Sequence, residues 1–286
     1  MKQTPYTLGH SPDPDDAFMF YALAKDKIDA RGCRFEHILQ DIETLNQRAT
    51  RGELDISAIS IHAYAYVLDK YALLPCGASM GDGYGPLLVA RAGEGPGEHP
   101  GEIRAWLKER VIAVPGAMTS AVLALRLFLG DFQSVNVPFD QIFQRVHSGG
   151  ADVGLIIHEG QLTYAREGFS KVLDLGEWWK EKTGLPLPLG GNVIRKDIAP
   201  AVRKEISDIL RESIRYGLEN RAAGVRHSMG WARNLDTALA DRFIGMYVND
   251  LTLDYGERGR EAIRLFLGEA SAAGIIPAPV ELEFVD

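Results

Sequence analysis

The chemically most informative segment of this 286-residue chain ends in a histidine. Residues Asp152–Gly160 read Asp-Val-Gly-Leu-Ile-Ile-His-Glu-Gly, which predicts a buried strand that delivers His158 to its carboxyl end. In an open α/β sheet, ligands bind at that end of the strands. A neutral imidazole there could take a proton from a bound substrate, because its pKa lies near working pH. A histidine that is only hydrogen-bonded within the fold is the alternative, and it stays open on the residues alone.

Hydroxyl side chains follow two other predicted strands. Ser57 and Ser60 end the strand expected at 54–60. Thr119 or Ser120 would cap the helix that follows the strand expected at 111–114. Free amides at a helix N-terminus, together with hydroxyls, form an anion site that suits a carboxylate. Ordinary N-capping is an equally good interpretation.

An acidic segment, 13–16, precedes the first apolar helical run. Asp13 suits the N-cap, Pro14 has the φ of a first helical residue, and Asp15 and Asp16 complement the helix dipole. The junction follows the first strand, at the sheet edge where ligands bind. For Asp15 we favour a purely structural role.

Short strand-like and helix-like patterns alternate in the first third of the chain. Strands are expected at 5–9, 33–38 and 54–60, with helices between them. This alternation is typical of βαβ units around a largely parallel sheet, so the predicted class is α/β.

The two halves of the chain carry an internal repeat. Residues 41–56 superimpose on 138–153 when Asp55 is set against Asp152, and each copy reads helix, Gly, Asp, strand. Two such units predict two lobes that face each other across a cleft. Chance similarity of two ordinary helix–strand junctions is the alternative.

Two breaks suggest how the lobes divide the chain. The Gly/Pro-rich stretch 93–101 predicts a loop, and 184–192 predicts a second break, after which long helices run to about residue 274. Because the chain then crosses twice, we expect a larger lobe from 1–92 plus 191–286 and an inserted smaller lobe from 102–183. Such a layout closes around a small ligand by a hinge motion.

Composition excludes several functions. The chain has 31 Lys+Arg against 39 Asp+Glu, a formal charge of −8, so nothing drives non-specific binding to nucleic acid or to an anionic membrane. No apolar run is long enough to span a bilayer and no signal peptide is evident, so we expect a cytoplasmic protein. Cys33 and Cys76 suggest reduced thiols. His158, Glu159 and His62 match no metal motif, so no metal is expected.

Several segments together resemble one enzyme family, the 1,4-dihydroxy-6-naphthoate synthases of the futalosine route to menaquinone. The matches keep the family's order over roughly 9–195, and the set is specific although no single motif is decisive. They lie at Ser11–Phe20, Ser60–Tyr64, Val114–Gly116 with Thr119 and Ser120, Gly154–Glu159 and Pro188–Asn192.

The resemblance implies a fold like the type II periplasmic binding proteins, with the ligand between two α/β lobes. It implies a lyase that converts cyclic dehypoxanthine futalosine to 1,4-dihydroxy-6-naphthoate without metal or organic cofactor, with His158 as proton acceptor. The substrate would be held by residues in the matching segments: Ser57, Ala58, Ile59, Ser60, Thr119, Ser120, Asp16 and Asn192. Two departures are a stretch at 93–101 that looks longer than usual and Ser120 in place of a second Thr.

Two other functions fit the same architecture. Chorismate dehydratase of the same route resembles it in its two-lobe build, but its members do not show the strand end at Gly154–Glu159. A non-catalytic protein that binds a small carboxylate for a transporter would share the closing cleft, but it would need export. The expected partner is a small-molecule carboxylate, and a homodimer is one assembly open to the chain.

Overall fold

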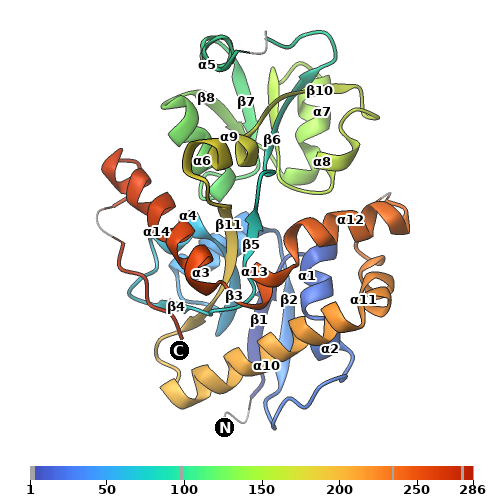
Figure 1. Ribbon diagram of the computed structural model, residues 1–286, viewed down its shortest axis with the longest axis vertical. Helices are drawn as coiled ribbons and strands as arrows, with labels where there is room; N and C mark the ends of the chain where they lie inside the picture. The colour runs from blue at the N-terminus through green and yellow to red at the C-terminus, as the bar shows by residue number, and fades with distance from the viewer. Residues whose placement is uncertain (1–3, 97–98, 234, 278–279, 286) are drawn as a thin grey trace.

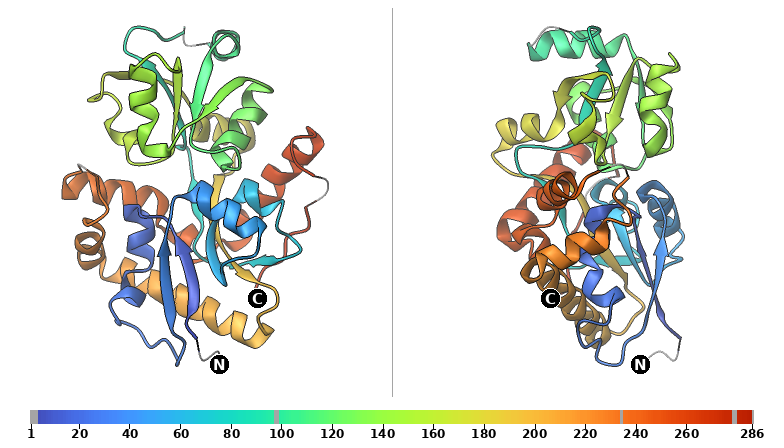
Figure 2. Two further views of the ribbon diagram at one scale, coloured as in Figure 1. Left: turned by 180° about the vertical axis from the view of Figure 1, so that it is seen from behind. Right: turned by 90° about the vertical axis from the view of Figure 1, so that its right-hand side faces the viewer.

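Two mixed β-sheets, each flanked by helices, form the two lobes of the molecule (Figure 1). The computed structural model describes residues 4–96, 99–233, 235–277 and 280–285. Both ends of the chain lie in the larger lobe, as Figure 1 and the rear view in Figure 2 show. The α/β class and the two-lobe arrangement expected from the sequence are confirmed.

The larger lobe contains the sheet with the order β2-β1-β3-β11-β4, in which β5 also pairs with β11. Its strands are β1 (Tyr6–His10), β2 (Phe35–Leu39), β3 (Ile56–Ser60), β4 (Tyr71–Leu73), β5 (Ser79–Gly81) and β11 (Leu187–Arg195). Its helices are α1 (Pro14–Met19), α2 (Tyr21–Ala24), α3 (Ile42–Thr50), α4 (Ile61–Tyr64), α10 (Pro200–Glu219), α11 (Arg221–Ser228), α12 (Thr237–Tyr247), α13 (Asp250–Leu253) and α14 (Gly256–Ala272).

The smaller lobe contains the sheet with the order β10-β6-β9-β7-β8. Its strands are β6 (Leu87–Arg91), β7 (Val111–Val114), β8 (Gln133–Asn136), β9 (Val153–Ile156) and β10 (Phe169–Asp174). Its helices are α5 (Pro100–Lys108), α6 (Ser120–Leu129), the short 3-10 helix η1 (Phe139–Gln141), α7 (Ile142–His147), α8 (Gly160–Thr163) and α9 (Leu175–Thr183).

The internal repeat is confirmed by the topology and by one hydrogen bond in each lobe. The first, second and third strands of the repeat are β1, β2 and β3 in the larger lobe and β7, β8 and β9 in the smaller one. In each lobe the first lies between the second and the third, all parallel, and the third pairs on its other side with an antiparallel strand, β11 or β6. Asp55 accepts a hydrogen bond from the Thr7 amide at 2.9 Å, and Asp152 accepts one from the Val111 amide at 2.8 Å. Each aspartate thereby joins the start of the third strand to the start of the first.

One expected break is a strand. The segment 184–192 was expected to interrupt regular structure, but β11 begins at Leu187 and pairs with both β3 and β5. The prediction was wrong because the sheet accommodates the breakers: pairing shifts register between Pro188 and Gly190. At Gly191 a Cβ would lie 2.5 Å from the Tyr255 hydroxyl oxygen, so the strand needs a residue without a side chain there.

The sheets divide the chain near, but not at, the expected lobe boundaries. Strand β6, inside the segment 1–92 assigned to the larger lobe, pairs in the sheet of the smaller lobe, while β11 returns to the larger one. Both crossings run between the lobes in Figure 1. Of the expected loop at 93–101, residues 93–96 and 99 lie outside helices and strands, α5 begins at Pro100, and 97–98 lie outside the described residues.

Helix α6 joins the lobes on one side. It contacts α4, β11 and α14 of the larger lobe as well as α5 and α9 of its own. One apolar cluster therefore includes Ile59 of the first sheet, Leu123 of α6 and Val153 of the second sheet, all fully buried. The lobes therefore share a core on this side.

A smaller expectation can be compared with the structure. Cys33 and Cys76 are both buried and both free thiols. A second observation concerns the pair Trp178 and Trp179: Trp179 is fully buried in the shared core and Trp178 packs against it. Among the described residues, no helix is both long and apolar enough to cross a membrane.

Candidate active site

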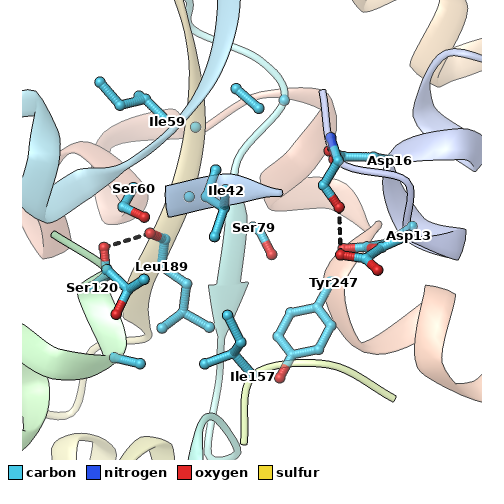
Figure 3. Close-up of a pocket in the computed structure, with 18 of the residues that line it drawn as sticks. Asp13, Asp16, Ile42, Ile59, Ser60, Ser79, Ser120, Ile157, Leu189 and Tyr247 are labelled. Carbon is cyan, nitrogen blue, oxygen red and sulfur yellow. Dashed lines mark hydrogen bonds between the residues drawn. The ribbon is translucent and has the colours of Figure 1, made fainter. Parts of the chain in front are cut away.

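A cavity of about 770 Å³, counted out to its open mouth, lies between the lobes. It opens where the loops after β1 and β3 of the larger lobe meet the loops after β7 and β9 of the smaller one. Figure 3 shows two chemically different sides, with Ser60 and Ser120 on one and Asp13, Asp16 and Tyr247 on the other. The lining residues used below are Asp13, Asp15, Asp16, Ile42, Ala58, Ile59, Ser60, Thr119, Ser120, Ile157, Gln161, Leu189, Asn192 and Tyr247.

The hydroxyl side is built around the N-terminus of α6. Thr119 is the N-cap, and its side-chain oxygen accepts a hydrogen bond from the Val122 amide at 3.3 Å. Ser120 donates to the Leu189 carbonyl at 2.5 Å and accepts from the His62 amide at 3.1 Å. The capping interpretation is thus confirmed for Thr119, and these contacts hold the helix start at the cavity, where its dipole favours an anion.

His62 supports this side from behind. Its Nδ1 lies 3.2 Å from the Thr119 carbonyl oxygen, a bond that requires the proton on Nδ1. Burial lowers the pKa of His62 to about 4, opposed by that carbonyl and aided by Arg126, so the ring is neutral at pH 7. It does not line the cavity, and its contacts make it a support for the Thr119–Ser120 segment.

The acidic side comes from the loop between β1 and α1. Asp13 is the N-cap of α1 by position, as expected, but its side chain makes no capping bond and instead accepts from the Ser11 hydroxyl. Asp16 accepts from the Ser11 amide at 2.6 Å, and burial raises its pKa to about 7 against that bond. Burial, with the charges of Asp16 and Asp13, raises the pKa of Asp15 well above its usual range. Asp15 lines the cavity, which exceeds the purely structural role we favoured.

His158 lies beside the cavity, one residue beyond β9 and Ile157. The residues flanking it, Ile157 and Gln161, line the cavity, while the His158 side chain is 11% exposed and is absent from the lining. Its ring is edged by Phe139 and Phe143, at 5.6 and 6.1 Å between centroids. The sequence predicts that the imidazole itself faces the crevice. In this conformation residues near it along the chain line the cavity, and the imidazole does not.

The hydrogen bonding of His158 defines its neutral form. Nδ1 accepts from the Gly160 amide at 3.0 Å, so Nδ1 carries the lone pair and the ring proton sits on Nε2. Burial lowers the pKa of His158 to about 4, with Arg233 acting in the same direction and Asp13, the Phe139 carbonyl and Asp140 acting against it. The imidazole is neutral at pH 7, as a base must be before it takes a proton.

Most of the substrate-binding residues expected from the resemblance meet at this cavity. Those in its lining are Ala58, Ile59, Ser60, Thr119, Ser120, Asp16 and Asn192. Ser57 is not among them: it is fully buried and donates to the Ala58 carbonyl at 2.8 Å. Asn192 is 2% exposed, and its Nδ2 has no hydrogen-bond partner among the described residues.

Sequence reasoning missed two contacts between the lobes at this site. Tyr247 of α12 donates its hydroxyl to Gln161 Oε1 at 2.6 Å, and Gln161 Nε2 donates to the Ile156 carbonyl at 3.2 Å. Arg233 reaches Asp13 at 2.9 Å and Glu159 at 3.4 Å. No local signal marks these residues, because Arg233, between α11 and α12, and Tyr247, at the end of α12, lie far along the chain from their partners. Within the described residues, no group of three or more His, Cys, Asp or Glu side chains is arranged to hold a metal ion.

Relatives of known name cover nearly the whole chain. Two 1,4-dihydroxy-6-naphthoate synthases are each 38% identical to it: that of Streptomyces coelicolor over 95% of this chain and 94% of its own length, and that of Thermus thermophilus over 95% and 96%.

Solved structures show the same architecture. A protein of Archaeoglobus fulgidus is 44% identical and superposes with a TM-score of 0.89, covering 96% of this chain and 100% of its own. The alkanesulfonate-binding protein SsuA of Xanthomonas axonopodis pv. citri is 12% identical with a TM-score of 0.71 over 97% and 96% of the two chains, and it shows the fold alone. The periplasmic-binding-protein-like fold implied by the resemblance is confirmed.

A family model described as menaquinone biosynthesis matches residues 6–272. Together with the two synthases, this match covers both lobes and the cavity between them. The chain therefore belongs to the menaquinone biosynthesis family, as the segments singled out in its sequence implied.

Proposed function

We propose that the chain is a 1,4-dihydroxy-6-naphthoate synthase, a carbon–carbon lyase that converts cyclic dehypoxanthine futalosine to 1,4-dihydroxy-6-naphthoate and a sugar-derived fragment. The observation that carries the proposal is the 38% identity, over 95% of the chain, to two proteins of that name. We further propose that it acts in the cytoplasm and without a cofactor.

The cavity suits a substrate with an acidic ring at one end and a polyol at the other. The α6 N-terminus, with Thr119 and Ser120, offers amides and a dipole to the carboxylate. The acidic side offers carboxyl oxygens that accept hydrogen bonds from sugar hydroxyls. Apolar side chains between the two sides, from Ile42, Ile157 and Leu189, would pack on the ring.

His158 would act as the base in this reaction. Its neutral ring can take the proton whose loss starts cleavage, and formation of an aromatic product favours the forward direction. The lone pair at Nδ1 is the one that the Gly160 amide occupies, so proton uptake there requires that bond to be released. A small movement of the segment after β9 on substrate binding would both free Nδ1 and bring it to the cavity.

The proposal is tested by incubating the purified protein with cyclic dehypoxanthine futalosine and following the fluorescent naphthoate. We expect product from the wild-type chain and its loss in His158→Gln. Parallel incubation with chorismate separates the dehydratase, which would release water from chorismate and no naphthoate. Tight binding of small carboxylates without turnover of either compound would contradict the proposal and favour a binding protein.

A further inference from the structure

Arg233 of the larger lobe reaches across the cavity to the segment that carries His158. Its Nη1 lies 2.9 Å from Asp13 Oδ1 and 3.4 Å from Glu159 Oε1, and its Nη2 donates to the Pro12 carbonyl at 3.3 Å. Its guanidinium also lies 4.8 Å from the centroid of the Phe139 ring, which edges His158. One side chain thus contacts three segments, two of which belong to the opposite lobe.

The Arg233 contact is matched by a second bond from the same region of the larger lobe. The Tyr247 hydroxyl, at the end of α12, holds Gln161, and Gln161 in turn holds the Ile156 carbonyl at the end of β9. Glu159 and Gln161 flank Gly160, whose amide binds His158 Nδ1. The short segment around His158 is therefore held at two points by the other lobe.

We infer that Arg233 is a positioning residue, which fixes the His158 segment against the larger lobe and balances the charge beside the imidazole when the cavity is closed. The inference rests on the proposed function. Its geometric basis is the contact with Glu159, which is 4% exposed and has one oxygen, Oε2, without a partner among the described residues. A carboxylate buried to this degree can stay ionised only if a cation, here Arg233, lies beside it.

Burial is the main cause of the lowered pKa of His158, and the neighbouring charges modify it. The charged groups that act on it are Asp13 before α1, Arg233 before α12, Asp140 in η1 and its own neighbour Glu159, whose Oε2 lies 3.7 Å from Nδ1. Asp13 and Asp140 raise the pKa of His158 and Arg233 lowers it. Arg233 thereby offsets the acidic loop that the substrate cavity requires.

The first test is the pH profile of kcat/KM for naphthoate release. In Arg233→Gln the pKa of His158 should rise, so the acidic limb should move to higher pH, and kcat should fall by about 10-fold to 100-fold because the base is less well placed. In Asp13→Asn/Arg233→Gln both charges are gone, so the limb should return toward the wild-type position. Arg233→Lys, which keeps the charge and loses the forked geometry, should keep the limb and recover part of kcat.

Arg258→Gln is the matched control. Arg258 also pairs with an aspartate near a crossing between the lobes, Asp82 at 2.9 Å, but lies far along the chain from the His158 segment and outside the cavity lining. We expect its profile and kcat to match the wild type. A loss as large as that of Arg233→Gln would mean that removing any arginine–aspartate pair near the lobe crossings lowers activity, which would contradict a specific role of Arg233.

The second test does not need turnover. In protein labelled with ¹⁵N-histidine, the His158 signals are assigned by their loss in His158→Gln, and their titration is compared in wild type and Arg233→Gln. We expect the midpoint at higher pH in the variant. If the wild-type enzyme is active but Arg233→Gln shifts neither the titration midpoint of His158 nor the acidic limb of the pH profile, or only one of the two, this inference alone is overturned. If the wild-type protein releases no naphthoate, the proposed function is overturned and, with it, the role of Arg233 in that reaction.

Discussion

The two lobes are copies of one topology that carry different chemistry. Aligning Asp55 with Asp152 places Ser60 opposite Ile157, Ile61 opposite His158 and His62 opposite Glu159. Both third strands end at the cavity and both lobes use an aspartate to tie strands together. The histidine proposed as the base thus has a fully buried isoleucine as its counterpart.

The difference shows where function resides in this fold. The strands and the aspartate ties are common to both lobes because they hold the sheets, whereas the loops after the first and third strands differ and supply much of the cavity lining. In the larger lobe these loops supply Asp13, Asp16 and Ser60, and in the smaller lobe they supply Thr119 and the His158 segment. The acidic side of the cavity comes from the larger lobe, whereas the hydroxyl side combines Ser60 of the larger lobe with Thr119 and Ser120 of the smaller one.

The largest expected effect separates His158 from its counterpart. His158→Gln should lower kcat/KM by about 1000-fold, since a positioned general base contributes a factor of this order. Ile61→Val, at the matching place in the larger lobe, should leave the rate within a few-fold of the wild type. Circular dichroism and a thermal melt would establish that both variants fold, and near-normal turnover by His158→Gln would contradict the assignment.

The two aspartates that join the strands should contribute unequally to the free energy of unfolding. Asp55 accepts from both the amide and the hydroxyl of Thr7, at 2.9 and 3.1 Å, whereas Asp152 is bonded to the Val111 amide. We expect Asp55→Ala to lower the free energy of unfolding by about 3 kcal/mol and Asp152→Ala by about 1.5 kcal/mol, from the strength of bonds to charged acceptors. Urea unfolding measures both, and Asn variants, which keep an acceptor oxygen, should lose less. Equal losses would show that the two ties are equivalent.

The buried histidine of the larger lobe should make the fold sensitive to acid. Burial lowers the pKa of His62 from 6.5 to about 4, so the unfolded chain binds a proton in this window that the folded chain does not. The free energy of unfolding should then fall as pH drops from 6.5 to 4, by about 3 kcal/mol through His62. Asp16, whose pKa is raised to about 7, contributes with the opposite sign between pH 4 and 7.

Comparison of variants isolates the His62 contribution. Urea unfolding of His62→Gln and wild type at several pH values should give curves that converge toward pH 4, because the variant lacks the titrating ring. Parallel curves across the window would show that His62 is protonated in the folded state. Asp16→Asn is the complementary control, since its curve should diverge from the wild type as pH rises toward 7.

The smallest effect concerns a position where the lobes differ by one methyl group. Gly160 aligns with Ala63, and a Cβ at Gly160 would lie 2.7 Å from His158 Cε1 and 2.9 Å from Phe143. Gly160→Ala should displace the imidazole and lower kcat by about 10-fold with little change in KM, because a small misplacement of the base suffices. Unchanged kcat would mean that the ring moves away from this position before it reacts.

Local signals in the sequence were sufficient for the repeated framework. The apolar run at 111–114 is β7, Thr119 is the cap of α6, and the Gly-Asp-strand pattern located Asp55 and Asp152 in equivalent places. Each of these depends on neighbours along the chain, and so does the placement of the α1 start after Asp13.

Features that depend on distant residues could not be found in this way. Strand β11 contains Pro188 and two glycines and is a strand only because β3 and β5 pair with it. Arg233 meets Asp13 across most of the chain, and a lone arginine in helical sequence looks like an ordinary solvated charge. The rotation of the His158 ring away from the cavity depends on Gly160 and Phe139, which sequence patterns do not orient.

The apolar cluster that runs through α6 has a consequence for how the molecule denatures. Because Ile59, Leu123 and Val153 belong to one apolar cluster shared by the lobes, neither lobe retains a complete core when the other is removed. Heat or urea should therefore melt both lobes in a single cooperative transition, and residues 87–183 expressed alone should expose the α6 surface and aggregate.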